Sequence, residues 1–210
     1  ESLTRIPTEV DIASEFRYRN PILDKNTLVI IISQSGETAD TLAALRLAKE
    51  KGARVLSVVN VVGSTIANES DGVIYTAAGP EIAVATTKAY STQLAVLYLL
   101  CGFFANERGL MDEEALSEYL HELQSVPKKI NEVLEANRER AKELAKLFVP
   151  LDHAYYIGRG LDYAAAAEGS LKMKEISYIH SEAYAAGELK HGTISLVENG
   201  TLIVALACHE

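Results

Sequence analysis

The sequence lacks an excess of basic residues and a long hydrophobic run, and each absence excludes a class of protein. Its 210 residues include 29 acidic and 20 basic side chains and carry a formal net charge of −9. A general nucleic-acid surface is therefore excluded, because it needs cations that displace counterions. The longest apolar run, residues 94–105, is shorter than the ~20 residues of a membrane-spanning helix. No secretory signal peptide is recognisable, and we expect a cytoplasmic protein.

Cysteine is also scarce. Cys101 and Cys208 lie in apolar runs, so we expect buried, reduced thiols rather than a disulfide. No spacing of His, Cys and Asp fits a metal site. The Walker lysine and a second glycine pattern are absent, which disfavours a nucleotide. We therefore expect neither a metal nor a cofactor.

What is present is an alternation of strands and helices. Apolar, β-branched runs predict strands at residues 28–32, 54–59 and 72–76, and residues 38–51 have helical spacing. A strand, helix and strand with short links form a right-handed crossover and imply a parallel sheet. We also predict a short strand at residues 8–13. The expected fold class is α/β, a parallel sheet flanked by helices.

The second half repeats this plan without repeating the sequence. An amphipathic helical stretch at residues 126–148 precedes a strand at 154–157, a helix at about 162–179 and a strand at 201–207. Residues 181–192, between that helix and the last strand, are polar and bounded by glycine. We place the domain boundary in the helical stretch, which gives domains at residues 1–125 and 126–210.

The segment Ser33 to Thr38, SQSGET, joins the strand at 28–32 to the following helix. Unpaired N–H groups at a helix N-terminus, together with hydroxyl and amide donors, form an anion site. The alternative is capping, in which Ser35 or Thr38 satisfies the first N–H groups of the helix. Four polar residues at the carboxyl end of a buried strand favour a ligand, since open α/β sheets bind ligands at that edge.

Glu168, Lys172 and Glu175 are spaced to share one face of the helix at 162–179. The alternative is an exposed ladder of ion pairs that contributes little. The functional interpretation is a carboxylate base beside an ammonium, which suits moving a proton between adjacent carbons of a sugar.

His180 and His191 are the candidate imidazoles. A lone histidine is more often structural than catalytic. His191 is better placed, because it lies in a polar segment between Gly187 and Gly192, and loop residues often carry function. It could open a sugar ring as a general acid and base.

These residues resemble a known family. SQSGET followed by Ala-Asp-Thr-Leu resembles the phosphosugar-binding loop of sugar isomerase (SIS) domains. More narrowly, the chain is similar to the isomerase domain of the isomerising glutamine–fructose-6-phosphate aminotransferases (glucosamine-6-phosphate synthases). The similarity covers nearly the whole chain, with matching stretches at residues 15–18, 79–82, 87–89, 168–174 and 174–192, the last being KEISYIHSEAYAAGELKHG.

The resemblance implies a fold and a set of site residues. The fold is two SIS domains, each a flavodoxin-like three-layer sandwich. The phosphate would be held by Ser33, Gln34, Ser35 and Thr38, with Val84 and Thr86 lining the same pocket. The family commonly has Ser where Thr86 stands. Glu175 would move a proton between C1 and C2 with help from Lys172, and His191 would open the ring in the neighbouring subunit of a homodimer.

The implied reaction converts fructose 6-phosphate to glucosamine 6-phosphate, using ammonia released from glutamine by a glutaminase domain of the full-length chain. We expect this chain to be a fragment: the N-terminal strand and helix of the first domain, the later strands of the second, and the family's Schiff-base lysine are not found. Lys172 and Lys190 do not take that lysine's role.

Two alternatives remain. One is a phosphosugar-sensing SIS module without chemistry, for which Glu175, Lys172 and His191 would be unnecessary. The other is an isomerase acting on a different amino or keto sugar phosphate, because phosphate-loop residues do not read stereochemistry.

Overall fold

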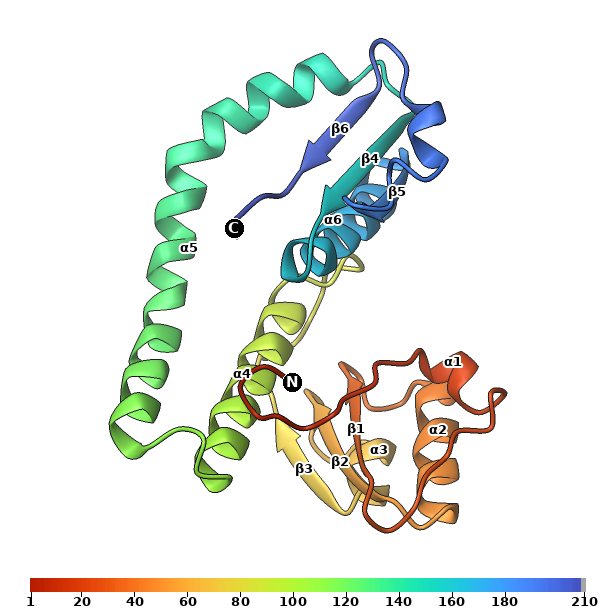
Figure 1. The fold of residues 1–210 in the computed structure, drawn as a ribbon, viewed down its shortest axis with the longest axis vertical. Coiled ribbons are helices and arrows are strands. Elements are labelled where there is room, and N and C mark those ends of the chain that lie inside the picture. The colour runs from red at the N-terminus through yellow and green to blue at the C-terminus, as the bar shows by residue number, and fades with distance from the viewer. Residues whose placement is uncertain (209–210) are drawn as a thin grey trace. The chain divides into compact units, whose positions relative to one another are not determined.

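The computed structural model describes residues 1–208, which divide into two compact units between Lys128 and Lys129 (Figure 1). Each unit has its own parallel sheet and its own hydrophobic core. The boundary falls within one long helix, α5 (Glu113–Phe148), which continues through Pro127. The expected fold class, parallel sheets flanked by helices, is confirmed.

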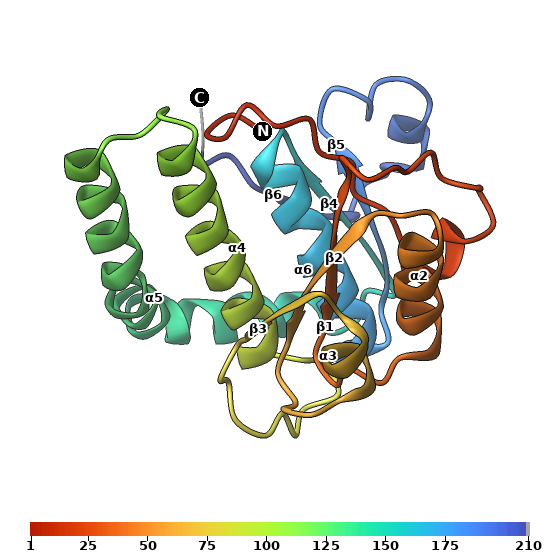
Figure 2. The same ribbon diagram turned by 90° about the horizontal axis from the view of Figure 1, so that it is seen from below.

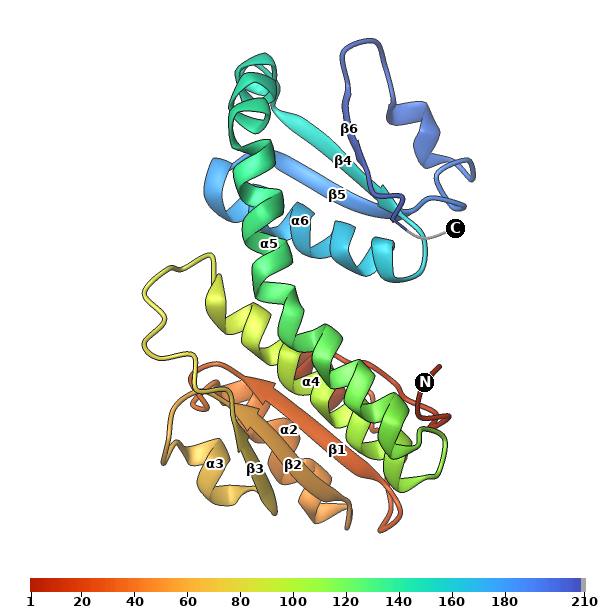
Figure 3. The same cartoon turned by 90° about the vertical axis from the view of Figure 1, so that its left-hand side faces the viewer.

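The first unit places three parallel strands in the order β1-β2-β3. The strands predicted at residues 28–32, 54–59 and 72–76 are present, and the helix predicted at 38–51 lies between the first two. The elements are α1 (Ala13–Phe16), β1 (Leu28–Ser33), α2 (Ala39–Glu50), β2 (Arg54–Val59), α3 (Thr65–Glu69), β3 (Gly72–Tyr75) and α4 (Lys88–Glu107). Helices α2 and α3 cover one face of the sheet and α4 covers the other (Figures 2 and 3).

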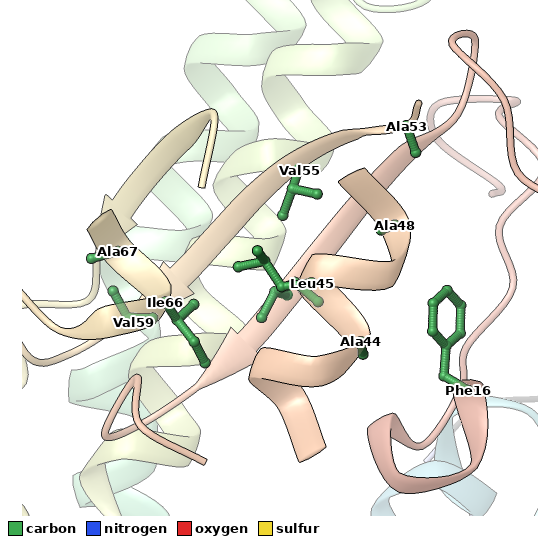
Figure 4. Packing of buried hydrophobic residues seen from close by; sticks show 10 residues of the cluster. Phe16, Ala44, Leu45, Ala48, Ala53, Val55, Val59, Ile66 and Ala67 are labelled. Atoms are coloured by element: carbon green, nitrogen blue, oxygen red, sulfur yellow. The ribbon is translucent and has the colours of Figure 1, made fainter. Parts of the chain in front are cut away.

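The core of this unit lies between the sheet and α2. Leu45 of α2 is fully buried against Val55 and Val59 of β2, and Ile66 of α3 closes the same cluster (Figure 4). Burying one such aliphatic side chain contributes about 1.5–3 kcal/mol. The core therefore fixes the carboxyl ends of β1 and β2, where the following loops begin.

The strand predicted at residues 8–13 is wrong. Residues 8–12 are irregular and α1 begins at Ala13. Val10 is 97% exposed, and local side chains satisfy the backbone: the Asp11 carboxylate accepts the N–H of Ile12, and the Glu1 carboxylate accepts that of Thr8. An apolar, β-branched run without a neighbouring strand does not form a ladder.

The second unit places three parallel strands in the order β5-β4-β6, with α6 packed on one face (Figure 3). Its core contains Ala154, Tyr156, Ala166 and Leu202. The elements are β4 (His153–Gly158), α6 (Leu161–Ser177), β5 (His180–Ala185), the 3₁₀ turn η1 (Thr193–Leu196) and β6 (Leu202–Ala205).

Strand β5 was not predicted, because its residues lie in what the sequence shows as a polar segment. Its inward positions are small: Ser181 is buried and bonds to Ser170 of α6, with 3.0 Å between the hydroxyl oxygens. Gly169 lets the same helix approach β4, since an added Cβ would lie 3.0 Å from the Tyr156 ring. Small residues therefore replace the large apolar ones by which strands are recognised.

The cysteines and the apolar stripe of α5 are more exposed than the sequence predicts. Cys101 and Cys208 are free, but Cys101 is only partly buried and Cys208 is exposed. The predicted apolar stripe of residues 126–148 lies on α5, where Ile130, Val133 and Leu134 are exposed. None of the helices within residues 1–208 is both long enough and apolar enough to cross a membrane.

Candidate functional site

The SQSGET turn follows β1 at the carboxyl edge of the first sheet and is folded by its own hydroxyls. The buried Ser33 Oγ accepts the N–H of Gly36 at 3.1 Å and lies 3.5 Å from the Thr38 hydroxyl. The Ser35 hydroxyl accepts the N–H of Glu37 at 3.2 Å. The turn thus gathers hydroxyl groups next to the N-terminus of α2.

The capping alternative can be tested at Thr38, which is the N-cap residue of α2. Its side chain makes no capping hydrogen bond to the helix and instead faces Ser33. The first N–H groups of α2 are therefore not satisfied by Thr38. A helix N-terminus in that state favours an anion.

The turn rests on the loop that follows β2. Gly36 has φ +67°, and a Cβ there would lie 2.1 Å from the Ser64 Oγ, so glycine is required on both counts. The Gly36 carbonyl accepts the N–H of Ile66 at 3.0 Å. The Glu37 carboxylate accepts the N–H of Thr65 at 2.7 Å. This bond lowers the pKa of Glu37.

Asn60, the residue after β2, connects this edge to the next segment. Its N–H donates to the Gln34 carbonyl at 3.1 Å. Its side-chain oxygen accepts the Thr76 hydroxyl and the N–H of Ala78, and its amide donates to the Gly79 carbonyl at 2.7 Å. Sequence reasoning missed this role. The available signal was an asparagine directly after a buried strand.

Val84 and Thr86 lie in the loop that leads into α4. The Glu81 carboxylate folds this loop by accepting N–H groups of Ala83, Thr87 and Ala89 at 3.1–3.3 Å. These bonds, above all that of Ala89, lower the pKa of Glu81. Val84 itself is 93% exposed, so within the first unit it contacts little protein that could enclose a ligand.

A hollow of the first unit lies elsewhere. Leu28, Arg54 and Gly72, the first residues of the three strands, line it together with Phe104 of α4. It is therefore at the amino ends of the strands, opposite the SQSGET turn. The position of the polar loops, rather than this hollow, identifies the candidate site.

The second unit carries the salt-bridged group that the helix spacing predicted. The Lys172 ammonium lies 2.5 Å from a carboxylate oxygen of Glu175 and 3.5 Å from one of Glu168. The side chains of Lys172 and Glu175 are only 25% and 31% exposed. Burial opposes the charge of Lys172, but the two carboxylates outweigh it and raise the pKa of this ammonium. Glu168 and Lys172 are thus partly buried, and Glu175 lies on the exposed side of the group.

His191 lies in an exposed turn before Gly192, and its N–H donates to the Glu188 carbonyl at 2.9 Å. His180 is at the start of β5, where its ring lies 3.5 Å from the Glu182 carboxylate. The structure therefore brings Lys172 and Glu175 together and leaves His191 outside their salt-bridged group. The hydroxyl turn belongs to the first unit, and Lys172, Glu175 and His191 belong to the second.

Known protein families and relatives match most or all of this chain. The family model of the SIS domain matches residues 1–101 and 147–210. Two curated relatives are named glutamine–fructose-6-phosphate aminotransferase (isomerizing): that of Clostridium tetani is 61% identical over 210 residues, and that of Caldanaerobacter subterraneus subsp. tengcongensis is 59% identical. Both matches span the whole of this chain but only 34% of the relative.

A solved structure shows the same similarity. It is the C-terminal domain of glucosamine-fructose-6-phosphate aminotransferase from Francisella tularensis, which is 40% identical with a TM-score of 0.95. The alignment covers 99% of this chain and 59% of that one. With the family model matching more than half of its residues, the chain belongs to the SIS domain family.

Proposed function

We propose that this chain is the isomerase portion of an aminotransferase that converts fructose 6-phosphate to glucosamine 6-phosphate. The ammonia would come from glutamine through a glutaminase domain of the full-length protein. Two curated relatives that match the whole chain are named as isomerising glutamine–fructose-6-phosphate aminotransferases. The observation that carries the proposal is the salt-bridged pair of Lys172 and Glu175, because a phosphosugar sensor has no need of a base.

In this proposal the SQSGET turn anchors the phosphate. The hydroxyls of Ser33, Ser35 and Thr38 and the amide of Gln34 supply donors, and the N-terminus of α2 supplies a favourable dipole. Val84 and Thr86 line the same pocket from their loop. The anchor holds the reactive carbons but transfers no proton.

The second unit supplies the chemistry. His191 opens the sugar ring, which exposes the C2 carbonyl. Ammonia adds there and water leaves, giving an imine. Glu175 then takes a proton from C1 and returns it to C2, while the proton of the C1 hydroxyl passes to the nitrogen, which leaves an amine at C2 and an aldehyde at C1. The Lys172 ammonium stabilises the negative charge that develops between the two steps.

The proposal extends to the assembly. The two units are two SIS domains with bounds near residues 1–125 and 126–210. The protein is a cytoplasmic homodimer in which His191 acts on the sugar held by the neighbouring subunit. The exposed position of His191 supports such an arrangement, since a ring-opening residue must reach a substrate.

Two other functions are separated by one experiment on the full-length protein. Glucosamine 6-phosphate formation from fructose 6-phosphate and glutamine is measured beside calorimetric affinity, for the unmodified protein and for Glu175→Gln. We expect Glu175→Gln to keep its affinity and lose proton exchange at C1 and C2. Binding without turnover by the unmodified protein would indicate a sensor, and turnover of another sugar phosphate alone would indicate a different isomerase.

A further inference from the structure

The SQSGET turn contains a carboxylate, which is unexpected at a site for a phosphate. Glu37 lies between Ser35 and Thr38, and its hydrogen bond to Thr65 lowers the pKa of its carboxyl. A negative charge beside an anion site weakens the attraction of the ligand. The carboxylate must therefore offer an advantage that offsets this repulsion.

The structure shows where that carboxylate is directed. It accepts the N–H of Thr65, the first residue of α3, at 2.7 Å. Beside it, the Gly36 carbonyl accepts the N–H of Ile66 at 3.0 Å. Gly36 packs directly on Ser64, with no space for a Cβ between them. Two consecutive residues of the turn are thus fastened to two consecutive N–H groups of α3.

We propose that Glu37 is a positioning residue, which braces the SQSGET turn against α3 and so raises its phosphate affinity without touching the phosphate. The inference rests on the proposed function. The brace lies between Ser35 and Thr38, so it fixes the backbone that carries their hydroxyls. Donors that are already in place lose less conformational entropy when the ligand binds.

Charge and bracing predict opposite effects for the same substitutions. Glu37→Gln removes the charge and keeps an oxygen that can accept the Thr65 N–H. Glu37→Ala removes both. If only the charge mattered, both variants would bind phosphate more tightly than the unmodified protein. If the brace matters, Glu37→Ala binds more weakly and Glu37→Gln recovers most of the loss.

The test measures the affinity of the full-length protein for fructose 6-phosphate and for inorganic phosphate by calorimetry. We expect Glu37→Ala to weaken both by about three- to tenfold, the range for one lost hydrogen bond. KM for fructose 6-phosphate should rise with kcat nearly unchanged, as for a loss of uniform binding. Glu50→Ala is the matched control: it also removes one negative charge, but from an exposed residue at the far end of α2. It should leave the affinities for fructose 6-phosphate and for inorganic phosphate unchanged.

A second variant removes the donor instead of the acceptor. Thr65→Pro deletes the N–H at the first position of α3, where proline is well tolerated. Ser64 already has φ −62° and ψ 160°, which is the conformation required before proline. Thr65→Pro should weaken binding as Glu37→Ala does, and the double variant should be no worse than either alone, because both remove the same contact between Glu37 and Thr65.

The outcomes distinguish a failure of the proposed brace from a failure of the proposed function. If the unmodified protein binds and Glu37→Ala binds as tightly or more tightly, the brace is wrong and the proposed function stands. If Glu37→Gln is as weak as Glu37→Ala, or if the double variant is additively weaker, the brace is also wrong. If the unmodified protein binds neither ligand, the proposed function fails and the brace fails with it.

Discussion

The ammonium of Lys172 lies 2.5 Å from a carboxylate oxygen of Glu175, one helical turn further along α6. Glu168 approaches the same ammonium from the preceding turn at 3.5 Å. One cation is thus shared by two carboxylates. Without it, the two carboxylates would repel each other.

Replacing Lys172 with Met should therefore lower turnover more than binding. We expect kcat of the full-length enzyme to fall by about 10²–10³-fold, as for the loss of an electrostatic stabiliser, with calorimetric affinity for fructose 6-phosphate nearly unchanged. Lys174→Met, on an exposed lysine of the same helix, is the control and should keep its activity. A Lys172→Met enzyme with full kcat would contradict the role given to the ammonium.

The hydroxyls of the SQSGET turn should determine affinity. Ser35→Ala and Thr38→Ala each remove one donor to the phosphate, and we expect each to weaken fructose 6-phosphate binding by about three- to tenfold. Thr38→Ser keeps the hydroxyl and should bind almost as the unmodified protein does. Unchanged calorimetric affinity of the alanine variants would refute the anion site.

Gly36 should be intolerant of any side chain. Its φ is +67° and a Cβ would lie 2.1 Å from the Ser64 hydroxyl, so Gly36→Ala should lower the free energy of unfolding by about 2–4 kcal/mol. Gly52 also has a positive φ, but its Cβ would meet open space. Gly52→Ala should therefore cost only about 1 kcal/mol. Thermal melts that show equal losses for the two variants would contradict the close contact.

Hybrid dimers can test the placement of His191. If His191 acts on the sugar of the neighbouring subunit, mixing inactive His191→Ala and Glu175→Gln proteins and allowing subunits to exchange should recover activity. A hybrid then contains one intact pairing of His191 with Glu175, so recovery near a quarter of full activity is about the upper bound for random mixing. Recovery at the level of the unmixed variants would show that the two residues act within one subunit.

Acid should loosen the loop that carries Val84 and Thr86. The pKa of Glu81 is lowered by the N–H groups it accepts, that of Ala89 first, so folding favours its ionised form. Its contribution to stability is present above the unfolded pKa and is lost as the pH falls through the lower, folded pKa. Glu81→Gln should therefore reduce the acid dependence of hydrogen exchange at the start of α4. An identical pH profile in both proteins would argue against this role.

The parts of the fold that the sequence predicted are those with a strong local pattern. The strand before Ser33 and the helix after it could be recognised because buried aliphatic runs and helical spacing are local properties. Strand β5 could not, because Ser181 is small and its burial depends on close contact with Ser170. The false strand at residues 8–13 shows the converse, since its pattern was present without a partner strand.

The candidate site divides in the same way. The hydroxyls of SQSGET lie within six consecutive residues, and Lys172 and Glu175 are three residues apart on one helix. Each group could therefore be predicted from spacing alone. The contacts of Glu37 with Thr65 and of Asn60 with Gln34 join separate segments. Apart from the position of Asn60 directly after a buried strand, no pattern in the sequence indicates these bonds, so the partners of the turn were visible only in three dimensions.

The dependence of the SQSGET turn on α3 also has a consequence for the order of folding. A growing chain that has reached only Glu50 contains β1, α2 and the hydroxyls that fold the turn, but not the later groups that bond to Gln34, Gly36 and Glu37. Those groups arrive with residues 60–66, and their bonds form only after the intervening loop closes. We infer that the anion cradle is completed only when the start of α3 has docked on the turn.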